Sequence, residues 1–124
     1  GKLWFGTSGG VSCYDGKTWA TLTTEDGLAD KEVKTILQDR EGHFWFGTVA
    51  GGVSRYDART FRSFTTEEGL ADNRVNAMIK DREGTLWFGT EGGVSRYDGK
   101  TWTTGHALFL VEIGEGYQSA AKAS

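Results

Sequence analysis

The chain has 124 residues, the usual size of one domain, and its 14 basic and 17 acidic residues give a net charge of −3. This mild acidity is not typical of a nucleic-acid-binding protein, which needs a clustered basic surface. The longest apolar run, residues 107–111, is far too short to cross a membrane, so no membrane contact is expected for this segment. Cys13 is the only cysteine, which excludes a disulfide within the chain.

One sequence unit occurs three times and predicts the fold. Its clearest copy, residues 86–102, reads LWFGTEGGVSRYDGKTW, and related copies span residues 3–19 and 44–61. The leading tryptophans of the copies are separated by 41 and then 42 residues: Trp4, Trp45 and Trp87. Self-similarity at about 40–50 residues, with alternating apolar and turn residues, is typical of β-propeller blades.

The unit predicts four antiparallel strands, inner, second, third and outer, over residues 74–80, 85–90, 94–97 and 100–104. The inner strand is mostly apolar, as expected for a strand covered on both faces. The second strand is aromatic and the third alternates apolar and polar residues. Turn signals separate the strands, above all Asp98-Gly99, which is typical of a β-hairpin. Four strands per repeat match one propeller blade.

Two similar polar segments, residues 23–30 and 65–72, connect the copies. Leu28 and Leu70 are their only large apolar residues, so we expect these leucines to fill the gaps between blades. In the middle copy Ala58 replaces the glycine of the Asp-Gly hairpin. Because alanine disfavours positive φ, this hairpin is expected either to change its turn type or to lose about 1 kcal/mol of stability.

The sequence therefore predicts an all-β fold, with β-propeller blades of four antiparallel strands and about three blades per chain over residues 1–116. The expected boundaries are about 1–22 for blade one, which lacks its own inner strand, 31–64 for blade two, 73–104 for blade three, 105–116 for a closing inner strand, and 117–124 for a disordered tail.

A lone arc of about three blades does not close, because propellers usually have about 4–8 blades. Its two aromatic flanks would stay unpaired, which favours association. We therefore expect self-association into a homo-oligomer, in which residues 105–116 complete a blade of another copy. A dimer of about six blades is favoured over a trimer of about nine. The alternative is that the chain, which begins Gly-Lys, is a piece of a longer propeller.

Residues 2–104 resemble the two-component regulator propeller repeat. The resemblance lies in the repeated pattern Asp-x-x-Gly-x-Leu-Trp-Phe-Gly-Thr-x-Gly-Gly-Val-Ser-Arg-Tyr-Asp-Gly-Lys-Thr-Trp and in the pattern Thr-Thr-x-Asp/Glu-Gly-Leu-Ala-Asp between the copies. Members of that family carry such blades in the sensor half of bacterial hybrid histidine kinases. The resemblance implies an extracytoplasmic, periplasmic location. It also implies a ligand-sensing or protein-interaction module, not an enzyme.

Several motifs suggest chemistry but have simpler interpretations. The paired carboxylates of residues 39–42 and 81–84 suggest a calcium loop or an acid–base pair, yet no further carboxylate follows at the spacing of a calcium loop. Hairpin turns whose aspartate binds backbone amides are favoured instead. The Gly-Gly loops lack the lysine and the helix of a phosphate loop. Cys13, His43 and His106 show neither ligand spacing nor an activating partner, so no catalytic residue, metal or cofactor is predicted.

The five tryptophans suggest sugar stacking, but the leading three are expected in the core between blades. Trp19 and Trp102, on outer strands, are the better candidates for exposure. The longer connectors and the Gly-Gly loops share one rim, where binding residues usually lie. The candidate ligand-binding residues there are Glu25, Asp26, Asp30, Glu67, Glu68, Asp72, Asn73 and Glu91. This acidic rim suits a cation, a polyol or a basic peptide, so a carbohydrate or peptide ligand is expected, with solvated loops that bind nothing as the alternative.

Two other functions remain open. Near-identical copies also fit a purely architectural or engineered blade array without a ligand. An enzyme resembling streptogramin lyase is disfavoured, because such chemistry needs polar residues that break the repeat, and here the repeats are nearly uniform.

Overall fold

The computed structural model describes residues 1–105, 107–113 and 116–121, and the side chains of residues 1–105. Blade one is a three-stranded antiparallel sheet in the order β1-β2-β3, with bounds Leu3–Thr7, Gly10–Tyr14 and Trp19–Leu22. Blade two has the order β4-β5-β6-β7, with bounds Val33–Gln38, Phe44–Thr48, Val53–Tyr56 and Phe61–Phe64. Blade three has the order β8-β9-β10-β11, with bounds Val75–Lys80, Leu86–Thr90, Gly93–Tyr97 and Trp102–Gly105.

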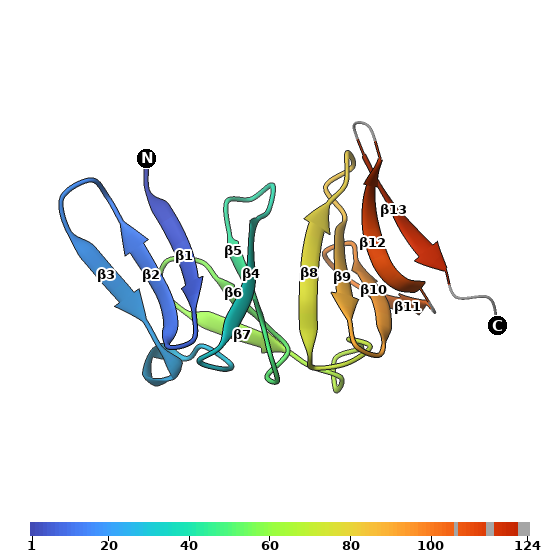
Figure 1. Ribbon diagram of the computed structural model, residues 1–124, viewed down its shortest axis with the longest axis horizontal. Coiled ribbons are helices and arrows are strands. Elements are labelled where there is room, and N and C mark those ends of the chain that lie inside the picture. Colours follow the sequence, from blue (N-terminus) through green and yellow to red (C-terminus); the bar gives the residue numbers. More distant parts are fainter. Residues whose placement is uncertain (106, 114–115, 122–124) are drawn as a thin grey trace.

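The three sheets stand side by side in chain order (Figure 1). The inner strands β4 and β8 of neighbouring blades lie against each other, and β1 lies against β4. Within each blade every strand pairs antiparallel with the next along the chain. The expected all-β architecture of antiparallel propeller blades is confirmed.

Each hairpin between an inner and a second strand is closed by an aspartate that also holds a tryptophan. Oδ1 of Asp39 accepts hydrogen bonds from the backbone amides of Glu41 and His43 at 3.0 and 2.9 Å. Its Oδ2 accepts from the indole N–H of Trp45 at 2.8 Å. In blade three the same bonds, at 3.0, 2.9 and 2.8 Å, join Asp81 to Glu83, Thr85 and Trp87. The interpretation of these carboxylates as turn-forming groups is confirmed.

The same bonds set the charge state of the turn. Burial alone would raise the pKa of Asp81, but hydrogen bonds from the Trp87 indole and from the amides of Thr85 and Glu83 outweigh it and hold the pKa below its usual value. The carboxylate is therefore ionised at neutral pH and is an acceptor only.

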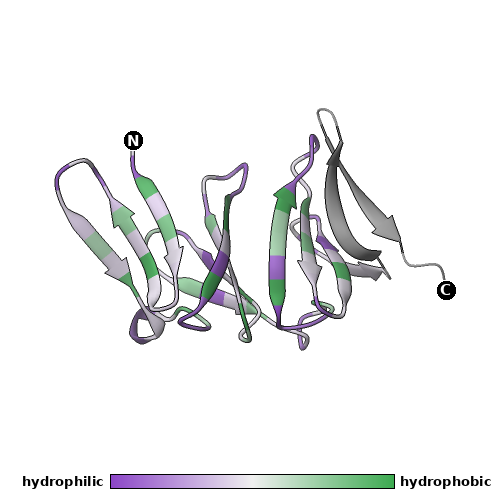
Figure 2. Cartoon of the chain, viewed as in Figure 1, coloured by the Kyte–Doolittle hydropathy of each residue, from purple (hydrophilic) through white to green (hydrophobic). Residues whose placement is uncertain are grey.

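Side chains of neighbouring blades interlock in two apolar clusters. The first joins blades one and two through Val11, Leu28, Val33 and Phe46. The second joins blades two and three and includes Trp45, Phe64, Leu70, Phe88 and Tyr97. Leu28 and Leu70 are each only 3% exposed, so their predicted place between blades is confirmed. In Figure 2 the hydrophobic colour lies along the strands, and the connecting loops are mostly hydrophilic.

The tryptophans divide by their place in the arc. Trp45 is 1% exposed, whereas Trp19 is 63% exposed, as expected for an outer strand. Trp102 is half-buried, so its expected exposure is only partly confirmed: its ring lies 5.5 Å from that of Phe64 in blade two and 5.1 Å from that of Phe88 in its own blade. An outer strand is thus shielded where a preceding blade lies beside it.

The hairpin of blade two keeps the conformation of the other two in spite of its alanine. Ala58 adopts φ 79°, close to the φ of 100° at both Gly16 and Gly99. Asp57 still accepts hydrogen bonds from the backbone amides of Arg59 and Thr60 at 2.9 and 2.8 Å. The turn type therefore does not change. Of the two expected outcomes, the structure shows the one in which Ala58 adopts the left-handed conformation.

The C-terminal region differs from expectation. Strands β12, Ala107–Ile113, and β13, Gly116–Ala121, form a separate antiparallel pair, and β12 lies against β9 and β10. Among the described residues the expected closing strand therefore pairs with β13. The predicted disorder from residue 117 is wrong for residues 117–121, because their backbone pairs with β12. Residues 106, 114–115 and 122–124 lie outside the described residues.

Replacing Ala58 by glycine should raise the free energy of unfolding by about 1 kcal/mol, because glycine adopts positive φ without a Cβ clash. Denaturant unfolding of A58G and of the parent chain measures this difference. Gly99→Ala is the matched reciprocal variant, since a Cβ at Gly99 meets no atom within 4 Å and the substitution adds only backbone strain. Equal stability of A58G and the parent chain would contradict the account.

Asp81→Asn should lower the free energy of unfolding at pH 7 by about 2 kcal/mol, because the amide group of asparagine would face an N–H donor. The pKa of Asp81 is depressed in the folded state, so its contribution is complete above its unfolded pKa and falls as pH drops through its folded pKa. The difference in the free energy of unfolding between the variant and the parent chain should therefore become smaller below about pH 4. Glu41→Gln removes the same charge from the exposed part of the blade-two turn and should have little effect.

Candidate functional site

The acidic rim is built on two capped turns. The 3₁₀ turn η1, Thr24–Asp26, is preceded by Thr23, whose backbone amide donates to Oδ2 of Asp26 at 2.8 Å. The Glu25 amide donates in return to Oγ1 of Thr23 at 3.2 Å. The second connector has the same pair of hydrogen bonds. The Thr65 amide donates to Oε1 of Glu68 at 2.6 Å, and the Glu67 amide donates to the Thr65 hydroxyl at 3.2 Å. Asp26 and Glu68 therefore shape their own loops.

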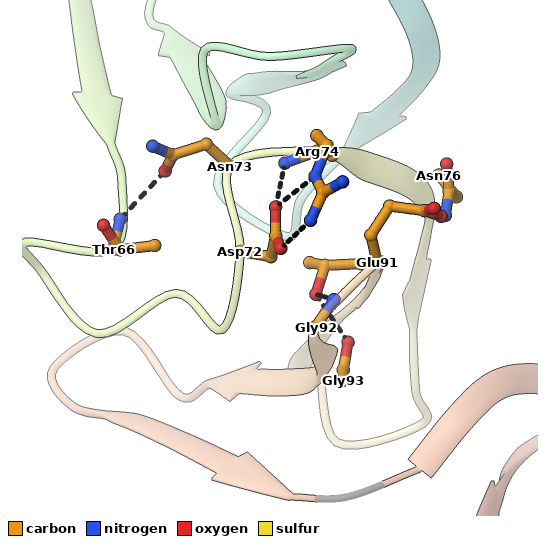
Figure 3. A network of polar contacts seen from close by, with 9 residues as sticks. Thr66, Asp72, Asn73, Arg74, Asn76, Glu91, Gly92 and Gly93 are labelled. Carbon is orange, nitrogen blue, oxygen red and sulfur yellow. Dashed lines mark hydrogen bonds and ion pairs between the residues drawn. The ribbon is translucent and has the colours of Figure 1, made fainter.

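The ends of the connectors are fixed by the next candidate residues. Asp30 accepts from the backbone amides of Glu32 and Ala50 at 3.2 and 2.9 Å, which ties the first connector to the Gly-Gly loop of blade two. Asn73 accepts from the amide of Thr66 at 3.0 Å (Figure 3). These two side chains hold the loops of the rim in place.

Asp72 forms an ion pair with Arg74 on this rim. Its Oδ2 lies 2.7 Å from Nη2 of Arg74, and its Oδ1 also accepts from Nε of Arg74 at 3.0 Å (Figure 3). The side-chain hydrogen bond from Arg74 lowers the pKa of Asp72, and the same contact raises the pKa of Arg74. Both carboxylate oxygens of Asp72 are therefore bound to the side chain of Arg74.

A small depression lies at the inner-strand end of this rim. It has a volume of about 210 Å³ and is lined by Lys34, Val49, Arg74, Asn76 and Glu91. Nζ of Lys34 donates to Oδ1 of Asn76 at 3.3 Å, and Nδ2 of Asn76 donates to Oε2 of Glu91. A cation, an amide and a carboxylate thus converge from β4, β8 and the loop after β9.

Of the predicted ligand-binding residues, Glu91 lines this depression, whereas most of the others support the loops. Sequence reasoning missed Lys34, Arg74 and Asn76. The signal was present, because Lys34 and Asn76 follow equivalent valines on the inner strands of nearly uniform repeats and yet differ. The capping pattern Thr-x-x-Asp/Glu likewise indicates that Asp26 and Glu68 bind backbone amides.

The opposite rim carries two larger clefts, one between each pair of blades. The cleft between blades two and three has about 230 Å³ and is lined by polar side chains that include His43, Arg55 and Asp98. The cleft between blades one and two has about 620 Å³ and is lined by Trp4 and Tyr56 among others. Sequence reasoning chose the rim with the longer connectors and did not foresee these clefts.

The Gly-Gly loops have a structural explanation. Oγ1 of Thr90 donates to the carbonyl of Gly93 at 2.7 Å and accepts from the Gly92 amide at 3.2 Å. A Cβ at Gly52, which has φ 83°, would lie 2.3 Å from the carbonyl oxygen of Phe64. These glycines allow the outer strand to approach the loop.

Among the described residues, no three His, Cys, Asp or Glu side chains are grouped so that they could hold a metal ion. His43 has its Nδ1 3.7 Å from Oδ2 of Asp39, which already accepts from the Trp45 indole. No helix in the described ranges combines the length and the apolar character that crossing a membrane requires.

Comparisons with known proteins agree with this geometry. Residues 27–50 and 69–92 match the family model described as two component regulator propeller. A search of curated proteins found no significant match. Among solved structures, the chain is similar to the extracellular domain of a protein assigned as a hybrid two-component system in B. thetaiotaomicron, with a TM-score of 0.74 and 29% identity over 83% of this chain. The chain spans 15% of the length of that relative.

Each matched stretch begins in a connector and runs through the inner strand, the Asp-x-x-Gly hairpin and the second strand to the Gly-Gly loop. These are the segments in which equivalent side chains make equivalent hydrogen bonds in blades two and three. Residues 27–50 and 69–92 thus match the two component regulator propeller family, and the sheets that contain them fold as propeller blades.

Proposed function

We propose that the chain is a non-enzymatic ligand-sensing or protein-interaction module within the extracytoplasmic propeller of a two-component signalling protein. The match to the propeller family and the likeness to the extracellular domain of a hybrid two-component system support this proposal. The observation that carries it is that two kinds of residue lie in different places. Residues that repeat between blades, such as Asp39 and Asp81, form the turns, whereas residues that differ between blades, such as Lys34 and Asn76, line the depression on the connector rim. Binding groups that differ between repeats suit recognition, whereas the repeated groups are used for folding.

The ligand contacts are assigned to the depression lined by Lys34, Arg74, Asn76 and Glu91. These side chains offer hydrogen-bond donors and acceptors of both charges, which suits a carbohydrate with several hydroxyl groups or a polar peptide. Glu25 and Glu67, exposed on the connectors of the same rim, extend its acidic character.

The alternatives have less support. Catalysis like that of streptogramin lyase needs a histidine with acidic metal partners, and the carboxylate nearest His43 is bound to a tryptophan and two amides. A purely architectural array accounts for the uniform framework but not for the differences between Lys34 and Asn76 or between Val49 and Glu91.

Binding of the labelled chain to an array of oligosaccharides and peptides tests the sensor function. For any component that binds, Asn76→Ala and Glu91→Gln should each weaken binding about tenfold or more, because each removes a hydrogen-bonding group from the depression. Glu41→Gln, which removes the same charge from an exposed position on the opposite rim, is the control and should bind like the parent. Thermal unfolding checks that the variants are folded. Equal binding by all variants would contradict the assigned site.

We further propose that isolated chains associate through the open flanks of the arc, with a dimer of about six blades favoured over a trimer. Leu3, Phe5 and Trp19 on the flank of blade one are 59%, 43% and 63% exposed, which supports association. Native mass spectrometry should show a species of twice the chain mass, and Phe5→Glu should shift it to monomer. A monodisperse monomer of the parent chain would reject the proposal.

A further inference from the structure

Two arginines face each other on neighbouring strands of blade two. Arg55 of β6 and Arg62 of β7 are cross-strand partners in the register of this sheet. Like charges directly opposite each other on antiparallel strands are destabilising. Blade two therefore carries a doubled positive charge that the repeat does not require. The equivalent partners in the other blades are Cys13 with Ala20 and Arg96 with Thr103.

Aromatic rings hold both guanidinium groups. Cζ of Arg55 lies 5.7 Å from the ring centroid of Trp45 and 5.5 Å from that of Phe64. Cζ of Arg62 lies 4.7 Å from the ring centroid of Phe64. Both charges therefore lie beside the same ring. Stacking on an aromatic ring uses the flat face of a guanidinium and leaves the N–H groups on its edge able to donate hydrogen bonds.

No carboxylate neutralises this pair within the part of the chain whose side chains are described. Among residues 1–105, no acidic side chain forms an ion pair with Arg55 or Arg62, and neither arginine donates a hydrogen bond there. Glu68 interacts with Arg62 only at a distance. The hydrogen bond from the Thr65 amide is the main cause that lowers the pKa of Glu68, and the charge of Arg62 adds a smaller part.

Arg55 is half-buried and lines the cleft of about 230 Å³ between blades two and three, together with His43. Both walls of this cleft belong to complete four-stranded blades. Its aspartates are directed elsewhere, because Asp39 binds two amides and an indole, and Asp98 accepts from two backbone amides of its own hairpin at 2.9 Å. The two other acidic residues of the cleft are exposed: Glu41 and Glu83.

We propose that Arg55 and Arg62 form a site for a phosphate group, either free phosphate or the monoester of an organic ligand whose remaining part lies in the adjoining cleft. The group bridges the two guanidiniums, so that both repelling charges gain a negative partner. A phosphate has enough oxygens to accept from two guanidinium forks, whereas one fork occupies both oxygens of a carboxylate. The cleft lies on the opposite rim from the depression around Asn76, so this site does not depend on the ligand binding proposed there.

Titration of the full chain, labelled with nitrogen-15, with inorganic phosphate tests the proposal by NMR. Sodium chloride keeps the ionic strength constant, so that screening of the two charges does not change. The Nε–H resonances of Arg55 and Arg62 should shift and saturate with one phosphate per chain. Arg96 is the internal control, because its Cζ lies 5.7 Å from the Trp87 ring but its cross-strand partner is Thr103. Its resonance should not shift.

The variant Arg62→Thr gives blade two the arginine–threonine pair of blade three. It should bind phosphate about tenfold or more weakly, because the charge-assisted hydrogen bonds of one guanidinium are lost. Arg96→Gln removes the same charge outside the site and should bind like the parent chain. Phosphate should also raise the unfolding temperature of the parent chain more than that of Arg62→Thr, since only the parent has the complete site. The same unfolding curves show that both variants are folded.

Glucose 1-phosphate distinguishes the two sources of the phosphate group. Binding tighter than that of inorganic phosphate, with a shift of the His43 ring resonances, would assign the site to a phosphorylated ligand that extends into the cleft. Tighter binding of inorganic phosphate would assign it to the free ion. The proposal would be overturned by the absence of saturable shifts at Arg55 and Arg62, by equal shifts at Arg96, by equal binding of acetate, or by equal phosphate binding of Arg62→Thr.

Discussion

The hydrogen bonds of one carboxylate hold each complete blade together. Asp39 and Asp81 each bind two backbone amides of a hairpin with one oxygen and an indole N–H of the second strand with the other. A short turn thereby fixes the angle of a large ring, and that ring supplies the contact with the next blade. Trp45 is the clearest case, because its ring lies 5.6 Å from Phe88 of blade three. Local turn chemistry and packing between blades are therefore coupled.

This coupling makes the blades interdependent. An inner strand, its connector and its turn serve the blade that contains them, but the buried faces lie between blades. The glycines of the second strands show how close the approach is, since a Cβ at Gly47 would lie 2.8 Å from Cγ1 of Val75 in the next blade. Blade one has similar residues to its neighbours but keeps several of them exposed, because burial depends on contact with a neighbouring blade as well as on residue type.

The fold was largely predictable because its signals are periodic and local. The strands, the Asp-Gly hairpins and the burial of Leu28 and Leu70 follow from residue type and spacing. The partial burial of Trp102 could not be predicted because it depends on Phe64 of a neighbouring blade. The strand over residues 117–121 could not be predicted because its pairing with β12 leaves little compositional signal. The candidate site was harder, since a carboxylate such as Asp30 looks free in sequence and is bound by an amide 20 residues away in the structure. The depression around Asn76 depends on side chains from two blades.

The exchange of the indole N–H protons with solvent, followed by NMR, tests the central claim most directly, because it reports the hydrogen bonds themselves. The account predicts slow exchange for Trp45 and Trp87, whose N–H groups are bound to Asp39 and Asp81, and fast exchange for Trp4 in the free chain. Exchange of Trp45 and Trp87 as fast as that of Trp4 would contradict the claim that the turn carboxylates hold the blades together.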